Sequence, residues 1–154
     1  MERQVIMSEI SFKIHSLFCG VEKGVIENRE NLFISTMGVK DDYHQDKHII
    51  LTDIDTINTI DKQKEIALCL PKFYAHIISD QALSLEVGDY IVHKDISLIV
   101  RQCGKNCHMN EGCEYFNTHG SCELNTNVYY LESESQGEIN INETWRIMKC
   151  IDMP

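Results

Sequence analysis

The sequence has little that would break a compact fold: its 154 residues include only two prolines, and no low-complexity stretch or Pro/Gly-rich linker interrupts it. With 43% hydrophobic and 25% charged residues, its composition is typical of a folded chain and excludes a disordered one. No window approaches the about 18 continuous apolar residues that a membrane span needs. We therefore expect a globular chain with a packed core and no membrane insertion.

Basic residues are also scarce. The chain has 14 Lys and Arg residues against 24 Asp and Glu residues, which gives a formal net charge of -10. A surface of this sign repels phosphate backbones and anionic lipid head groups. Nucleic acid is therefore excluded as a default partner, and protein partners are favoured over sulfated glycans.

The first twenty residues carry charges throughout and lack the apolar stretch of about 7 to 15 residues that defines a secretory signal. This favours the cytoplasm. The cysteines favour the opposite compartment, because four of the seven lie in the segment RQCGKNCHMNEGCEYFNTHGSCEL with the spacing C-x3-C-x5-C-x8-C. Four sulfurs at this spacing form either a zinc site inside a cell or disulfide bonds outside one.

Short β-strands are indicated over much of the chain. Residues 5–18 alternate apolar and polar side chains, which predicts a half-buried strand with Phe12 and Ile14 on one face and Ser11 and Lys13 on the other. Further strands are expected at 31–37, 48–51, 128–131 and 145–150, and a turn followed by a strand at 85–93. Residues 55–68 fit a helix or two short strands. We expect Trp145 and one of Tyr129 and Tyr130 in the core.

One helix is predicted at 96–108, with Asp95 as its N-cap. Apolar residues recur along it at three- and four-residue spacing, and Cys103 and Cys107 fall one turn apart on the buried face. The expected fold class is α+β, with one helix packed on a small antiparallel sheet and a β-rich segment before it.

The cysteine segment resembles the PAN/apple family of extracellular modules. The resemblance rests on the C-x3-C-x5-C phrase, the aromatic pair Tyr115-Phe116 and the closing Cys122-Glu123-Leu124. It implies a PAN/apple-like domain at 69–154, preceded by a β-rich segment of unknown type at 1–68. It also implies three disulfide bonds, which are Cys103 with Cys122, Cys107 with Cys113, and Cys69 with Cys150. Cys19 is left without a partner.

Other candidate sites are weaker. Asn142-Glu143-Thr144 is an N-glycosylation sequon before the last strand. Asp41, Asp42, His44 and His48 could hold a metal, but the segment lacks helical periodicity and is interpreted as a solvated acidic loop. Cys107 and His108 are neighbours that would point about 100° apart on a helix, so they do not form a catalytic pair.

The sequence therefore predicts a non-catalytic recognition module, secreted or at the cell surface, that binds a protein or carbohydrate partner and needs no cofactor. The alternative is an intracellular interaction domain stabilised by zinc on Cys103, Cys107, Cys113 and Cys122. No reaction is indicated, and the oligomeric state is open.

Overall fold

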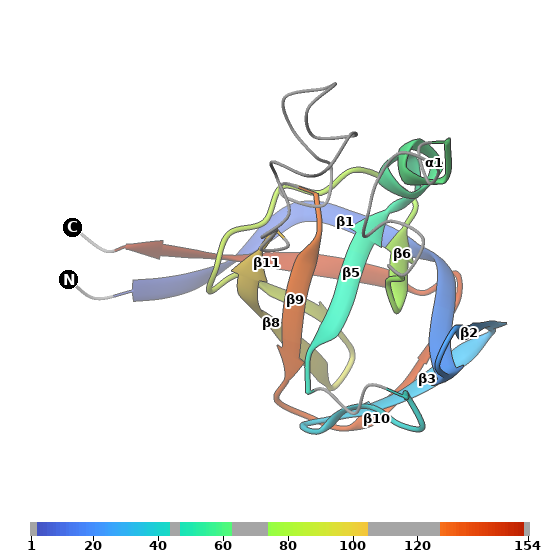
Figure 1. Cartoon of the computed structure of the whole chain (residues 1–154). Helices are drawn as coiled ribbons and strands as arrows, with labels where there is room; N and C mark the ends of the chain where they lie inside the picture. The colour runs from blue at the N-terminus through green and yellow to red at the C-terminus, as the bar shows by residue number, and fades with distance from the viewer. Residues whose placement is uncertain (1–2, 44–46, 63–73, 105–126, 153–154) are drawn as a thin grey trace.

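The strands form a barrel in the computed structural model, which describes residues 3–43, 47–62, 74–104 and 127–152 (Figure 1). An eight-stranded sheet has the order β11-β7-β8-β9-β5-β6-β1-β2, and β11 pairs with β1 as well. This extra pairing closes the sheet on itself. Strands from both sides of residue 68 pair with one another in this ring, as β5 does with β6 and β9.

The strands of the barrel are β1 (Arg3–Glu22), β2 (Val25–Arg29), β5 (Ile49–Asp53), β6 (Ile77–Ser79), β7 (Tyr90–His93), β8 (Ile96–Cys103), β9 (Tyr129–Ser133) and β11 (Thr144–Asp152). A second sheet has the order β10-β3-β4, with β3 (Asn31–Ser35), β4 (Gly38–Val39) and β10 (Gly137–Asn140). Figure 1 shows this small sheet beside one end of the barrel.

The long strand β1 follows the alternation of its sequence. Phe12 and Ile14 are buried, whereas Ser11 and Lys13 are exposed, as predicted. The strand pairs first with β11, then with β6 and finally with β2, and its register shifts along the way. Such bulges bend a strand and raise its twist, so β1 can curve around the barrel and contribute to three pairings.

The two parallel neighbours, β5 and β6, are connected through α1 (Ile54–Lys62). The helix begins after Asp53, whose carboxylate accepts hydrogen bonds from the backbone N–H (2.8 Å) and the hydroxyl (3.0 Å) of Thr56. This is the geometry of an N-cap. Within the described residues, no helix is long and apolar enough to cross a membrane.

The core lies inside the ring of strands. Trp145 and Leu17 are fully buried, Tyr129 is 5% exposed and Tyr130 is half-buried, which confirms the expectation for the large aromatic residues. The largest fully buried side chains are Trp145, Ile14, Leu17, Leu32, Ile34, Ile49, Leu51, Ile77, Ile78, Ile91 and Leu98. β-Branched side chains dominate this set, as expected where residues pack on a pleated surface.

The helix predicted at 96–108 is wrong over its described part, because Ile96–Cys103 is strand β8. It pairs with β7 on one side and β9 on the other. A short, continuous apolar run fits a buried strand as well as a helix face, so its periodicity does not decide between them. Asp95 is not an N-cap: with Lys94 (φ 52°) it connects β7 to β8, since His93 pairs with Ile96.

The predicted α+β fold with a disulfide framework is therefore wrong, and the chain forms a β-barrel. Cys103 and Cys150 carry free thiols, as does the buried Cys19. The other cysteines of the predicted bridges, at 69, 107, 113 and 122, lie outside the described residues. A closed barrel buries a continuous apolar interior, so its fold does not depend on the disulfide bonds that a small helix-on-sheet module needs.

Candidate functional site

A cavity of about 490 Å³ opens at the end of the barrel where β1 leaves for β2. Its volume falls in the range of small-molecule sites, roughly 300 to 1,000 Å³. The lining combines apolar side chains with two adjacent carboxylates and a tyrosine ring; its residues are Val21, Met37, Val39, Asp41, Asp42 and Tyr43.

The two aspartates have opposite surroundings. Asp41 is exposed, and its backbone has a φ of 67°, in the left-handed region that Asp tolerates better than most residues. The next residue, Asp42, is only 5% exposed. One carboxylate therefore faces solvent at the mouth of the cavity and the other lies in its wall. The interpretation of this segment as a solvated loop is wrong for Asp42.

The buried carboxylate of Asp42 is held by donors from distant parts of the chain. Its Oδ1 accepts a hydrogen bond from the backbone N–H of Gly20 at 2.8 Å. The Tyr74 hydroxyl lies 3.2 Å from Oδ1 and 3.1 Å from Oδ2, and donates to this carboxylate. Hydrogen-bond donors positioned by the fold offset much of the cost of removing the charge from water.

His76 completes this network as a neutral ring. Its Nδ1 accepts the backbone N–H of Ile50 at 3.0 Å, so Nδ1 must carry a lone pair and the proton belongs on Nε2. Nε2 lies 3.2 Å from Asp42 Oδ1, without the alignment of a hydrogen bond. The ring therefore turns its N–H side toward Asp42 without cancelling the negative charge.

These contacts keep Asp42 ionised. Burial acts to raise its pKa, but the N–H edge of His76, the Gly20 N–H and the Tyr74 hydroxyl outweigh burial and hold the pKa below its ordinary value. The pKa of Tyr74 moves the other way, because burial and the neighbouring carboxylate both disfavour a phenolate. At neutral pH the cavity thus has an ionised carboxylate in its wall and a second aspartate at its mouth.

A glycine is required where β1 meets this network. A Cβ at Gly20 would lie 2.6 Å from Tyr74 Oη and 2.9 Å from Tyr74 Cζ, closer than real side chains approach. It would also lie 3.4 Å from Asp42 Oδ1. A glycine inside a strand often marks a close approach of this kind, and that signal was present in the sequence.

Cys19 precedes this glycine but is not an activated nucleophile. It is fully buried, and burial raises the pKa of its thiol, an effect that Asp42 reinforces and Arg29 opposes. A reactive cysteine needs the reverse, a lowered pKa and a free base. Both nitrogens of His76 already face other groups, so His76 does not serve as that base.

The rim of the cavity is apolar and aromatic. Met37 is 76% exposed and Tyr43 is 44% exposed. Phe33 lies outside the lining; it is 43% exposed, and its ring centroid is 5.9 Å from the ammonium group of Lys40. An exposed ring and a thioether beside carboxylates are suited to a ligand that has both an apolar part and a positive charge.

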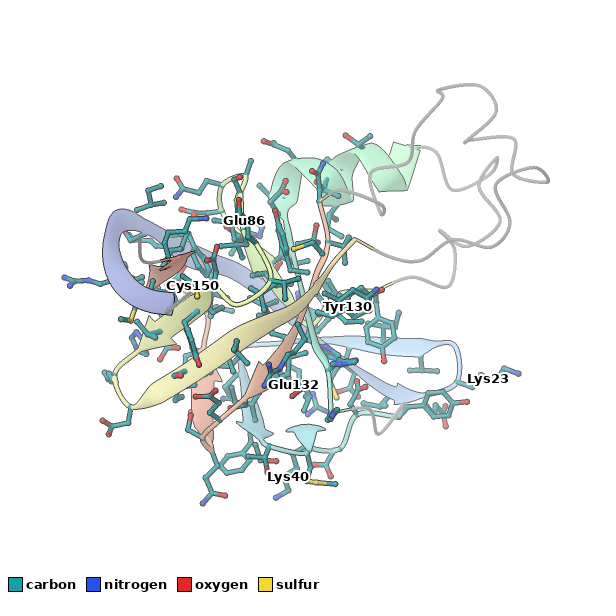
Figure 2. All side chains as sticks on the ribbon, turned by 90° about the vertical axis from the view of Figure 1, so that its left-hand side faces the viewer. Lys23, Lys40, Glu86, Tyr130, Glu132 and Cys150 are labelled. Atoms are coloured by element: carbon teal, nitrogen blue, oxygen red, sulfur yellow. The ribbon has the colours of Figure 1, made fainter. Side chains whose placement is uncertain are left out.

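A second carboxylate network lies on the outer face of the barrel, where Figure 2 shows Glu132 and Tyr130 of β9. Glu132 Oε1 is 3.2 Å from Lys47 Nζ and 3.5 Å from His48 Nε2, and Oε2 is 3.3 Å from Arg101 Nε. The His48 ring also packs edge-on against Tyr130. His48 thus pairs with Glu132, and its predicted metal partner His44 lies outside the described residues.

The other candidates from the sequence are scattered. Asn142 is exposed in the turn between β10 and β11, with a φ of 68°. The Cys103 thiol donates to the carbonyl of Leu85 at 3.4 Å. Among the described residues, no group of three or more metal-ligating side chains converges. The zinc site on four cysteines stays a prediction, since three of its four ligands are not described.

The fold has counterparts among solved structures. No protein-family model matches the chain, and no curated protein matches it. The YuaD protein of Bacillus subtilis is similar with a TM-score of 0.64 at 13% identity, over 96% of this chain and 98% of that one. YiiM of Escherichia coli is similar with a TM-score of 0.57 at 11% identity, over 94% of this chain and 71% of YiiM. A hypothetical protein of known structure is similar with a TM-score of 0.61 at 11% identity, over 90% of this chain and 67% of that one.

These likenesses show that the chain has a β-barrel fold like that of YuaD and YiiM. At such low identity they show the fold alone. They overturn the resemblance to the PAN/apple family and the disulfide-bonded module that it implied, and they conflict with the extracellular glycoprotein expected from the sequon. The motif misled because C-x3-C-x5-C is short, and its first two cysteines were placed on a helix although Cys103 ends a strand.

Proposed function

We propose that this protein is a non-catalytic binding barrel whose cavity takes an organic cation, an ammonium group carried on an apolar body. The recognition function expected from the sequence is retained, and the PAN/apple module is replaced by the cavity at the end of the barrel. The proposal rests on one observation: two carboxylates, from Asp41 and Asp42, line the same cavity as Tyr43 and Met37, and this cavity is large enough for a small ligand.

Charge favours a cation over a neutral ligand. A ligand that fills the cavity removes water from the exposed carboxylate of Asp41, and the neutral His76 ring does not compensate the charge of the buried Asp42 beside it. A sugar offers hydroxyl donors but no countercharge, so it would leave much of that desolvation cost in place. An ammonium group supplies the opposite charge. The net charge of -10 also attracts cations over longer distances.

The rim favours an apolar body on that cation. The exposed ring of Tyr43 offers a π-face for a cation or an aryl group, and Met37 offers a soft, adaptable contact. A small, fully hydrated inorganic cation would use neither of these surfaces. The chemistry of the cavity is therefore best matched by an alkyl- or arylammonium ion.

The states of Cys19 and His76 support binding without catalysis. The thiol is protonated at neutral pH because burial raises its pKa, and the imidazole uses Nδ1 to accept a backbone N–H. The buried part of the site is thus organised to hold Asp42 in place. It does not supply a base or a nucleophile to the cavity.

Calorimetric titration with three probes of the same shape tests the proposal: benzylamine, benzyl alcohol and benzoate. We expect benzylamine to bind with a Kd of about 1 mM, suitable for so small a ligand. Benzyl alcohol and benzoate should bind at least about tenfold more weakly, a difference of about 1.4 kcal/mol. Equal binding of benzyl alcohol would contradict a cation site.

A matched pair of variants locates the binding. Asp41→Asn removes one charge at the mouth and retains a residue that tolerates a positive φ, so it should weaken benzylamine about fivefold. Glu86→Gln also removes one negative charge, but far from the cavity: Figure 2 shows Glu86 on the opposite side of the molecule from Lys40, which lies next to the cavity. This control variant should leave the affinity for benzylamine unchanged. Equal effects of the two variants would place the binding elsewhere.

A further inference from the structure

The first part of β1 and the last part of β11 form a two-stranded ribbon that projects from the barrel (Figure 1). Its register runs from Arg3 opposite Asp152 to Met7 opposite Met148. The pairing of β1 with β6 starts only at Ile14, and the pairing of β11 with β7 ends at Met148. Among the described residues, no third strand pairs with residues 3–7 of β1.

The register shows which backbone groups this ribbon leaves open. Met148 pairs with Tyr90 of β7, and the Cys150 N–H donates to Asp89 Oδ1 at 2.9 Å, so both residues direct their backbone groups away from β1. Residues opposite each other in an antiparallel pair alternate between bonded and non-bonded positions. Val5, opposite Cys150, therefore directs its N–H and C=O away from β11.

The two edges of the ribbon are therefore not equivalent. The β11 edge is covered at its base, because Asp89 accepts both the Cys150 N–H and the ammonium group of Lys149 (2.9 Å), which also donates to the carbonyl of Ser84. The β1 edge has no such cover within the described ranges. An open strand edge is a template for pairing with another strand.

Charge and apolar surface indicate what covers this edge. Residues 3–10 and 148–152 contain two basic residues, Arg3 and Lys149, and two acidic ones, Glu9 and Asp152, so their formal charges cancel. The whole chain carries -10, so two copies meet with less repulsion here than elsewhere. Ile10, next along β1, is 54% exposed and offers apolar area to such a contact.

We propose that two copies of this chain pair through the open edge of β1, in antiparallel orientation about a two-fold axis near Val5. An antiparallel strand edge is complementary to itself about such an axis, so a second copy satisfies the donors and acceptors that the first presents. A two-stranded ribbon is marginally stable in water, whereas four strands support one another. The dimer sheet has the order β11-β1-β1-β11, and the cavity at the other end of β1 stays open.

The test is the molar mass in solution, measured by light scattering and sedimentation over a range of concentrations. The natural chain should be a dimer that dissociates on dilution. Val5→Pro removes an outward N–H without removing a hydrogen bond to β11. It should therefore give a monomer whose barrel has the same unfolding temperature as the natural chain. Ile10→Lys, with a charge beside the edge, should also shift the equilibrium to monomer by at least about tenfold.

Ile26→Lys is the matched control, because it places the same charge at an exposed isoleucine of β2. The turn before β2, which carries Lys23, lies across the molecule from Cys150 at the base of the ribbon (Figure 2). This variant should dimerise like the natural chain. A natural chain that is monomeric at every concentration would overturn the proposal. So would a dimer that persists unchanged in Val5→Pro and Ile10→Lys.

Discussion

Asp42 and Glu132 each meet a histidine, and the two carboxylates differ in what surrounds them. The side chain of Asp42 is 4% exposed; its donors are a backbone N–H and a tyrosine hydroxyl, and a neutral histidine ring lies beside it. The side chain of Glu132 is 22% exposed, and its neighbours are Lys47, His48 and Arg101. One network consists of rigid, uncharged donors around a buried charge, and the other of flexible cations on a wet surface.

This contrast teaches where an acidic chain can hold a specific site. A buried carboxylate with uncharged donors remains a net negative charge inside the protein, which can act on a ligand. A surface carboxylate among cations is largely neutralised and screened, and such pairs contribute little to stability. The site we propose is therefore at Asp42 and its exposed neighbour Asp41, and not at the larger cluster of charges around Glu132.

The largest effect should come from removing the buried carboxylate. Asp42→Ala leaves the Gly20 N–H and the Tyr74 hydroxyl without their acceptor in a buried place. We expect the free energy of unfolding to fall by about 3 to 5 kcal/mol, measured by urea denaturation. Tyr74→Phe removes only one donor and should cost about 1 kcal/mol. A loss below about 1 kcal/mol for Asp42→Ala would show that the network does not hold the fold.

The pH dependence of stability should identify the same carboxylate. The folded pKa of Asp42 lies below its ordinary value of 3.8, so the folded state binds the proton less readily than the unfolded one. The stabilisation is therefore complete above about pH 4 and is lost as the pH falls through the folded pKa. At about 1.4 kcal/mol for each unit by which the pKa is lowered, it amounts to roughly 1 to 2 kcal/mol. Asp42→Asn has no carboxylate to titrate and should lack this pH-dependent stabilisation. The difference in unfolding free energy between this variant and the natural protein should therefore shrink by the same amount when the pH falls from 5 to 2.

The smallest effect should come from the surface network. Glu132→Gln removes the charge that Lys47 and Arg101 share, but both cations remain in contact with water. The unfolding free energy should change by no more than about 0.5 kcal/mol, and added salt should reduce the change further. A loss comparable to that of Asp42→Ala would remove the distinction between the two networks.

Sequence patterns predicted those parts of the fold in which local alternation decides the outcome. Strand β1, with Phe12 and Ile14 inward, was predicted from period two, and β11 was predicted from Trp145 onward. The Ile96–Cys103 strand was missed because its apolar residues are nearly continuous. Its turn was missed because a lysine at positive φ, Lys94, carries no turn signal in the sequence.

The site was missed for a different reason. Asp42 is buried only because Gly20, Tyr74 and His76 approach it from positions more than twenty residues away. Two adjacent aspartates in a polar segment usually belong to a solvated loop, and the neighbouring sequence contains nothing that distinguishes them. Gly20 follows the predicted strand at 5–18 and lies within the observed strand β1, and a glycine at such a position is the available signal of a close approach.

The most direct test of the central claim is an amide NMR titration of the isotope-labelled protein with benzylamine at neutral pH. The account predicts saturable shifts at Val21, Val39 and residues 41–43, no comparable shift near Glu86, and a weaker response in Asp41→Asn. Shifts that spread over the whole surface without saturating, or equal shifts with benzyl alcohol, would contradict a cation-binding cavity.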